Sequence, residues 1–182
     1  EFRKAIRSSS SLLLSTAEGA TDALENEELD RHIGSLVWWS VTDVSTGVYD
    51  AITLSGKLSL ISDESLRAEI ASLRSSYGLL ETIERQSGET FSNSLMPYLY
   101  SHAHIPQLSN AQSAPPGPEA DRGAQPTLPV LTKRDHQPLL RDPEFIGIVT
   151  HYYWDQNDAH GMLLETISRL EHVSALIDAA VR

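Results

Sequence analysis

The sequence predicts an all-α protein, an antiparallel bundle of long helices with a long Pro-rich irregular insert. Eight of the nine prolines lie between Pro106 and Pro143. Proline disfavours regular helix because it lacks a backbone N–H and clashes with the preceding turn. On both sides of this segment, apolar residues recur at the three- and four-residue spacing of a helix face. We therefore expect a single helical domain over residues 1–182, with the insert at 103–141.

The residues before Ser62 predict three helices, with less regular apolar spacing. The first would cover residues 2–24, and residues 29–44 would form a second helix or a continuation of the first. A short third would cover 48–54, and Gly56 would end it as a C-cap glycine. A serine run at 8–11 and Gly19 weaken the first helix. Strands are the alternative within 37–48, where β-branched residues and threonine collect.

The helical pattern is strongest from Ser62 to Met96. Ser62 is the expected N-cap, since a serine hydroxyl can accept a hydrogen bond from a free backbone N–H. The expected end is the Met96–Pro97 pair, because a proline disfavours helix in the residue before it. The apolar residues of this segment alternate at steps of four and three, and they are Leu66, Ile70, Leu73, Tyr77 and Leu80.

A second long helix is predicted from Asp142 almost to Arg182. Asp142 is the expected N-cap and Pro143 the first helical residue, where a missing N–H costs nothing. A polar stretch at 155–161 interrupts the apolar face, so we expect a kink or local break there. The two long helices should pack antiparallel, and the residues expected to contact the first helix are Leu163, Ile167 and Leu170.

The insert separates into two parts by composition. Residues 109–125 are rich in Pro, Gly and small polar residues, which predicts a mobile segment because little apolar surface offsets its ordering entropy. Residues 128–140 contain several leucines, which predicts an extended segment anchored on the helices.

Charge and composition exclude several classes of function. The net charge of −11 disfavours nucleic acid and anionic lipid as partners. The absence of cysteine excludes disulfides and thiolate chemistry. The sequence contains neither a G-x-S-x-G motif nor a complete P-loop, so it predicts no catalytic residues and no cofactor.

Four histidines are the candidates for a metal site. His102 and His104 form an H-x-H pair, and a folded-back insert would bring the others near. Imidazole is a common ligand of zinc and other transition metals. Their alternative interpretation is as helix-terminal or surface histidines beside a proline-rich loop. The four candidates are His102, His104, His136 and His151.

Adjacent aromatic residues are the candidates for an interface. In such a pair one ring faces the core and its neighbour points elsewhere, and an exposed ring suits protein contact. Core packing is the alternative explanation at each position. The candidates are Trp38, Trp39, Tyr153 and Trp154.

The segment TLSGKLSLISDESLR, residues 53–67, resembles part of uncharacterised bacterial single-span membrane proteins with an all-helical soluble domain of unknown function. The resemblance extends to a long helix ending in Pro97-Tyr98-Leu99 and a last helix beginning at Pro143-Glu-Phe. It implies a non-catalytic domain that acts by protein–protein interaction, with a partner protein or as a homo-oligomer, or as a sensor. A metal-dependent enzyme using the histidines is the alternative.

The resemblance also implies a location. A membrane helix would precede Glu1, so the chain would meet the membrane only through a segment it lacks. The protein would belong to the bacterial inner membrane, with this domain in the periplasm or, as the alternative, in the cytoplasm.

Overall fold

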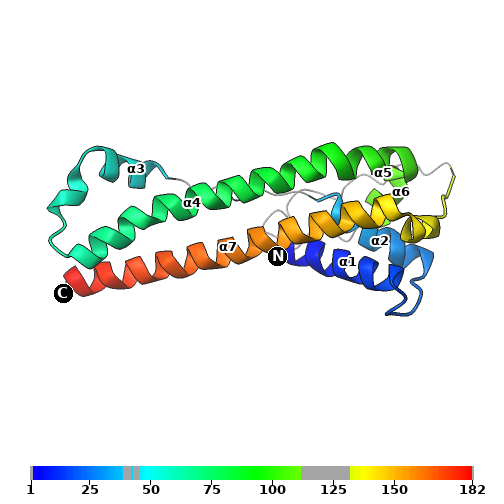
Figure 1. The fold of residues 1–182 in the computed structure, drawn as a ribbon, viewed down its shortest axis with the longest axis horizontal. Coiled ribbons are helices and arrows are strands. Elements are labelled where there is room, and N and C mark those ends of the chain that lie inside the picture. Colours follow the sequence, from blue (N-terminus) through cyan, green and yellow to red (C-terminus); the bar gives the residue numbers. More distant parts are fainter. Residues whose placement is uncertain (1, 39–41, 43–45, 112–131, 182) are drawn as a thin grey trace. The chain divides into compact units, whose positions relative to one another are not determined.

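The computed structural model describes residues 2–38, 42, 46–111 and 132–181, and every regular element in these ranges is helical (Figure 1). The all-α prediction is therefore confirmed. None of the described residues between 37 and 48 forms a strand. The elements in chain order are α1 (Phe2–Ala17), α2 (Asn26–Leu36), α3 (Gly47–Leu54), the 3-10 helix η1 (Lys57–Leu60), α4 (Glu64–Thr90), the π-helical segment η2 (Phe91–Leu95), α5 (Met96–His102), α6 (Ile105–Ala111), the 3-10 helix η4 (Gln137–Arg141) and α7 (Pro143–Val181).

Packing divides the chain into two compact units. The first unit comprises Glu1–Ser40 and Arg85–Asn157, and the second comprises Val41–Glu84 and Asp158–Arg182. The long helices α4 and α7 each contribute residues to both units. The single domain expected over 1–182 stays a prediction.

The first unit has the larger core. Its centre is Tyr152 of α7, which is fully buried and donates a hydrogen bond from its hydroxyl to the Trp38 carbonyl at 3.2 Å. Leucines of α2 and aromatic residues of α5 and α7 complete the core, so helices that are distant in the sequence share one apolar interior. The core side chains with the least exposure are Ile6, Leu13, Leu29, Ile33, Leu36, Leu95, Leu99, Leu108, Phe145, Val149 and Tyr152.

The second unit has a small core in which α4 and α7 contact each other. Leu66 and Leu73 of α4 pack with Val173 of α7, and Tyr49 of α3 meets Tyr77 edge-on at 6.1 Å between ring centroids. The predicted α4 stripe is largely confirmed, since Leu66, Leu73 and Leu80 are buried and Ile70 and Tyr77 are partly buried.

The stripe predicted on α7 is wrong at Ile167 and Leu170, while Leu163 is partly buried. Ile167 and Leu170 are 43% and 39% exposed, whereas Thr166 and Val173 are buried. Apolar spacing does not mark this buried face, because Thr166 is polar. Thr166 can be buried because its hydroxyl donates to the Met162 carbonyl of the same helix at 2.8 Å.

Asp63, and not Ser62, caps the start of α4. The Asp63 carboxylate accepts a hydrogen bond from the Leu66 N–H at 3.0 Å, and the helix begins one residue later at Glu64. A carboxylate at this position satisfies a free N–H and also interacts favourably with the helix dipole. The predicted boundary was therefore one residue early.

The helical chain does not end at Met96–Pro97. It passes through η2, in which the Met96 N–H bonds to the Phe91 carbonyl five residues back, and continues as α5 to His102. Pro97 supplies no N–H to the carbonyls of Ser92 and Asn93, and both of these residues are exposed, so water can satisfy those carbonyls. The widened turn thus accommodates proline within a continuing helix.

Helix α7 begins as predicted. Asp142 accepts a hydrogen bond from the Glu144 N–H at 2.9 Å, and Pro143 is the first helical residue. The local break predicted at 155–161 is wrong, since all of these residues are helical, and the alternative of a kink stays a prediction. Asp155 and Gln156 are polar yet buried, because partners in the same unit satisfy them: Thr90 donates to Asp155 at 2.6 Å, and Gln156 donates to Ser87 at 2.6 Å.

The N-terminal helices are shorter than predicted. The first ends at Ala17 and is followed by Gly19 with φ of +72°, a left-handed conformation that suits glycine. The second ends at Leu36, before the predicted limit at 44. The short third helix is confirmed at Gly47–Leu54, and Gly56 with φ of +72° terminates it as expected.

The insert at 103–141 contains two short helices, α6 and η4, so irregular structure is the wrong expectation for those residues. Leu139 and Leu140 are buried in η4, not in an extended segment. The mobility expected for 109–125 falls mainly outside the described residues, as does the start of the segment 128–140, since the description omits 112–131.

Candidate functional site

The first unit contains a buried carboxylate–imidazole pair that is hydrogen-bonded to several parts of the chain. Asp30 of α2 and His136, just before η4, lie 2.6 Å apart between Oδ1 and Nδ1. Asp30 is 7% exposed and His136 is 1% exposed. The other ring nitrogen of His136, Nε2, lies 3.1 Å from the backbone nitrogen of His104. Two segments of the insert therefore meet α2 through one imidazole.

These partners determine the tautomer of His136. The His104 backbone N–H can only donate, so Nε2 of His136 is the acceptor, and Nδ1 carries the proton that is donated to Asp30. Both ring nitrogens are thus occupied. In this arrangement His136 holds the chain together and has no free nitrogen for a metal ion or a substrate.

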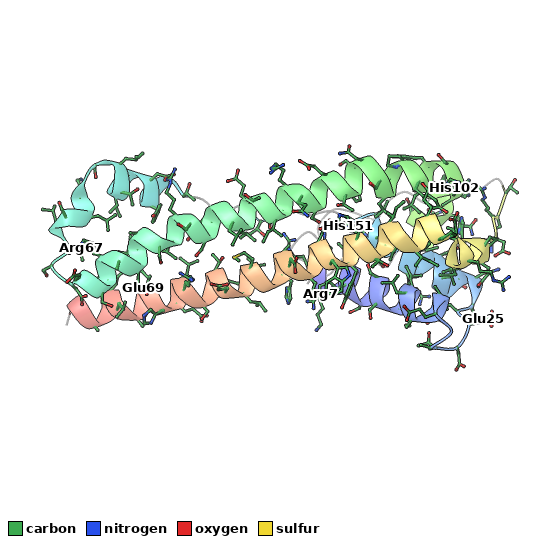
Figure 2. The ribbon with its side chains drawn as sticks, viewed as in Figure 1. Arg7, Glu25, Arg67, Glu69, His102 and His151 are labelled. Atoms are coloured by element: carbon green, nitrogen blue, oxygen red, sulfur yellow. The ribbon has the colours of Figure 1, made fainter. Side chains whose placement is uncertain are left out.

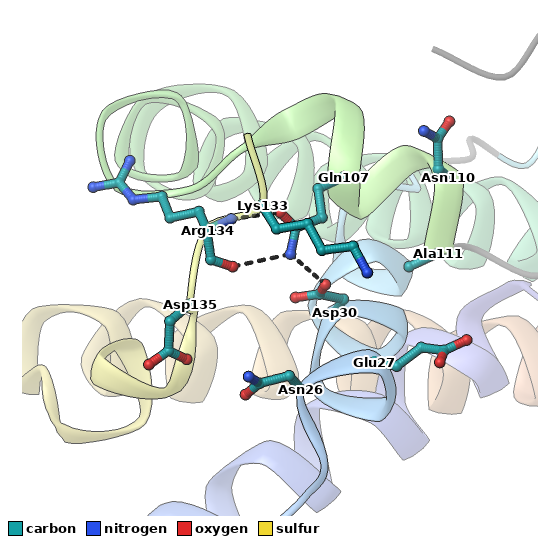
Figure 3. A pocket seen from close by; sticks show the side chains of 9 residues that line it. All are labelled: Asn26, Glu27, Asp30, Gln107, Asn110, Ala111, Lys133, Arg134 and Asp135. Atoms are coloured by element: carbon teal, nitrogen blue, oxygen red, sulfur yellow. Dashed lines mark hydrogen bonds between the residues drawn. The ribbon is translucent and has the colours of Figure 1, made fainter. Parts of the chain in front are cut away.

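Gln107 of α6 provides the hydrogen bond to the second oxygen of Asp30. Its side-chain amide nitrogen donates to Oδ2 of Asp30 at 2.6 Å and to the Arg134 carbonyl at 2.9 Å, while its oxygen accepts from the Arg134 N–H at 2.8 Å. Figure 3 shows Gln107 between Asp30 and the backbone of Arg134. Every hydrogen-bonding group of this pair is satisfied, as burial requires.

A hollow of about 580 Å³ lies beside this network. Charged groups of both signs surround it, with Lys133 and Arg134 from one segment and Glu27 and Asp30 from α2 (Figure 3). Because Asp30 already has partners on both oxygens, the free charges at the hollow are those of exposed side chains. The lining residues are Asn26, Glu27, Asp30, Gln107, Asn110, Ala111, Lys133, Arg134 and Asp135.

The other three histidines predicted as metal ligands lie in different surroundings. His102 donates from Nδ1 to the Tyr98 carbonyl at 3.0 Å and stacks on the Tyr98 ring. His104 has a buried Nδ1 without a hydrogen-bond partner in the described part of the chain. His151 is exposed, and its Nε2 lies 3.9 Å from Oδ2 of Asp155. Figure 2 shows His102 and His151 on separate helices.

The structure therefore brings together His104 and His136 but not the full set of four. Among the described residues, no group of three or more His, Asp or Glu side chains has the geometry to hold a metal ion. The metal site stays a prediction.

The aromatic candidates also have different environments. Trp38 is partly buried and packs against the core of the first unit, which is the core-packing alternative. Trp154 is 57% exposed and meets Tyr153 edge-on at 6.0 Å between centroids. Trp39 lies outside the described residues.

Tyr98 links the end of the insert to α5. Its hydroxyl donates to Oδ2 of Asp142 at 2.6 Å, while the other oxygen of Asp142 caps α7. Burial and this hydrogen bond raise the pKa of Tyr98, and the hydrogen bond from Tyr98 lowers the pKa of Asp142. Burial likewise raises the pKa of Tyr152.

Asp30 and Gln107 are the residues of this site that sequence analysis missed. The sequence does contain a signal for Asp30, because it lies on α2 beside Leu29 and Ile33, which face the core of the first unit. An acid in the apolar phase of a helix indicates a buried partner. Gln107 has no comparable signal, since it lies in a segment that was expected to be irregular.

Three comparisons give no match: no family model, no curated protein and no solved structure is similar to this chain. The resemblance to bacterial single-span membrane proteins thus stays a prediction. Among the described residues, no helix combines the length and apolar character needed to cross a bilayer.

Proposed function

We propose that this chain is a non-catalytic, all-helical domain of a bacterial membrane-anchored protein, and that it acts by binding another protein or as a sensor. The observation that carries the proposal is the distribution of exposed apolar side chains. Of the ten large apolar side chains that are exposed among the described residues, eight belong to the second unit. They are Ile52, Leu54, Leu60, Leu79, Leu164, Ile167, Leu170 and Ile177.

Such a concentration favours an interaction role. Exposed apolar residues scattered singly are ordinary, but apolar residues that gather on one element are typical of a surface that another protein covers, and four of the eight lie on α7. The buried polar network of the first unit supports the non-catalytic part of the proposal, since both ring nitrogens of His136 and both oxygens of Asp30 already have hydrogen-bond partners within the fold.

We further propose that α4 and α7 pack antiparallel as the long helices of a bundle. In the second unit, Arg169 of α7 donates to Ser72 of α4 at 3.4 Å, and Val173 meets Leu66 and Leu73. Residues late in α7 thus contact residues early in α4, which supports this arrangement. A location at the inner membrane, with the domain in the periplasm or alternatively in the cytoplasm, belongs to the same proposal.

Site-specific photo-crosslinking in cells producing the full-length protein tests the proposed function. A benzophenone amino acid would replace Leu54, Leu79 or Leu164, one at a time, with exposed Lys4 of the first unit as the control. We expect discrete protein adducts from at least one of the leucine positions and not from the control. If every position gives only uncrosslinked protein, the interaction role is wrong.

Metal analysis of the purified protein tests the alternative of a metal-dependent enzyme. A stoichiometric transition metal that is lost on His102→Ala or His104→Ala would support the enzyme and contradict our proposal. A metal-free protein with unchanged crosslinks would support the interaction role.

A further inference from the structure

Helix α7 has two apolar stripes within the second unit, of which one is buried and the other is exposed. The first stripe is buried, and its members lie seven residues apart at Ala159, Thr166 and Val173. This spacing of two helical turns keeps them on one face, and that face contacts α4 through Val173.

The second stripe is displaced from the first by one residue, since Ile167 follows Thr166 and Ser174 follows Val173. Its members follow the alternating four- and three-residue spacing of a coiled-coil seam, in which every third and fourth residue faces a partner helix. Ile167, Leu170 and Ile177 are 43%, 39% and 43% exposed, and Ser174 between them is exposed. Successive residues of a helix are about 100° apart, so this stripe borders the buried one without coinciding with it.

A helix with two adjacent apolar stripes is suited to contact two helices at once. In a four-helix bundle each helix packs against two neighbours, so both stripes are buried. Here α4 packs against the first stripe at Val173, and the second has three large apolar side chains in contact with solvent. The second stripe thus has the form of an unused helix-packing surface.

The charges beside this stripe specify what kind of helix fits it. Glu171 and Asp178 are exposed, and each lies four residues after a seam position, Ile167 and Ser174 respectively. Within the described part of α7, Arg169 is already paired with Glu165 at 3.0 Å between Nη2 and Oε1. Neither Glu171 nor Asp178 forms an ion pair with a described residue. The border of the second stripe is therefore negatively charged.

We infer that the second stripe of α7 binds an amphipathic helix of a different protein, one with an apolar seam flanked by Lys or Arg. This inference rests on the proposed function and names its partner class. A second copy of this chain fits less well, because its net charge is −11 and self-pairing would bring acidic borders together. A basic flank would instead place opposite charges beside Glu171 and Asp178, as at the edge positions of paired helices.

The probe for this inference is a fluorescein-labelled synthetic helix of three heptads, with leucine at the seam positions and lysine on both flanks. A matched peptide carries glutamate in place of each lysine. Fluorescence anisotropy at low ionic strength should show that the full chain binds the lysine peptide at least about tenfold more tightly than the glutamate peptide. Added salt should reduce this difference.

Variants of the chain locate the binding surface. The double substitution Ile167→Gln and Ile177→Gln should weaken binding of the lysine peptide by at least about tenfold, since two apolar contacts are lost. Glu171→Gln together with Asp178→Asn should weaken it by about fivefold and remove most of the salt dependence. Tyr100→Gln is the control, because Tyr100 is 67% exposed but belongs to α5 of the first unit, and this variant should bind as the unaltered chain does.

A further variant distinguishes loss of binding from loss of folding. Ser174→Lys changes an exposed side chain in the middle of the seam and removes no apolar contact, so it should leave the thermal melt unchanged and still abolish binding. Preserved binding by a folded Ser174→Lys variant would overturn the inference.

Other outcomes separate this inference from the proposed function. Equal binding of the two peptides would contradict the basic partner. A concentration-dependent dimer in sedimentation, lost in the Ile167→Gln, Ile177→Gln variant, would show that a second copy occupies the stripe. If neither peptide binds while photo-crosslinks still form at Leu54 or Leu79, the interaction role stands and this surface is wrong.

Discussion

Oδ1 of Asp30 and Nδ1 of His136 lie 2.6 Å apart, although 106 residues separate the two side chains in the sequence. Their hydrogen bond joins α2 to the end of the insert, and it is almost completely shielded from solvent. A charge-assisted hydrogen bond of this kind has a much larger effect on stability than an exposed ion pair does. The pair is therefore the first place to test how the insert is held.

Asp30→Asn should lower the free energy of unfolding by about 1–3 kcal/mol. Whichever way the new amide turns, its NH₂ group faces one of two donors, the His136 ring or the Gln107 amide, and leaves one bond unmade. Urea denaturation measures the change. Glu27→Gln is the matched control, because Glu27 is an exposed acid of the same helix, and an equal loss in both variants would contradict a special role for Asp30.

Leu73→Ala should lower the free energy of unfolding by about 2–5 kcal/mol, because Leu73 is only 4% exposed in the small core of the second unit. Leu170→Ala makes the same chemical change on α7, where the side chain is 39% exposed, and should cost much less. Chemical denaturation compares the two variants. Equal losses would mean that Leu170 is as buried as Leu73.

Thr90→Val should destabilise the protein by about 1–3 kcal/mol. The substitution keeps the side-chain shape and removes the hydroxyl that donates to buried Asp155 at 2.6 Å. Thr82→Val is the control, since the exposed Thr82 hydroxyl bonds only to the Gly78 carbonyl of its own helix. Thermal unfolding should show the larger decrease for Thr90→Val, and the reverse order would contradict the buried role of Asp155.

Stability should fall as the pH rises above 10.0, the ordinary pKa of tyrosine. Folding raises the pKa values of Tyr98 and Tyr152, so the unfolded chain loses these protons first and is favoured at high pH. Tyr98→Phe should make this alkaline decrease smaller. Melting temperatures of both proteins across the alkaline range measure it, and parallel curves would contradict the contribution of Tyr98.

At acid pH the dependence is reversed, and stability should fall as the pH decreases. Folding lowers the pKa of Asp142, so the stabilisation from its carboxylate is present above the ordinary value of 3.8 and is lost as the pH falls below it. Because the Tyr98 hydroxyl is the main cause of this shift, Tyr98→Phe should also flatten the acid decrease. An NMR titration of Asp142 would show its pKa return towards 3.8 in the variant.

The sequence was sufficient for the helical class and for helix ends with strong local signals. Asp142–Pro143 begins α7 and Gly56 ends α3 because caps depend on a few neighbouring residues. The packing face of α7 was not predictable in this way. Apolar spacing marked Ile167 and Leu170, but tertiary contact selected the neighbouring stripe with Thr166, and no local property of the helix distinguishes the two.

The candidate site was less predictable than the fold. His136 was identified by residue type, but its partner Asp30 is distant in the sequence, and its role depends on which groups meet each ring nitrogen. Such pairing is set by the folded chain and not by local spacing. The local break expected at 155–161 does not occur for the same reason, because Thr90 and Ser87 make polar residues compatible with a buried helix face.

The π-helical segment η2 changes how the periodicity of this region must be counted. Buried positions of α4 recur every seven residues at Leu66, Leu73, Leu80 and Ser87, which would place the next at residue 94. Ser94 is exposed and Leu95 is buried instead. The widened turn thus acts as a one-residue insertion in the repeat, and any comparison of this chain with another helical sequence across 91–95 requires a gap of one residue there.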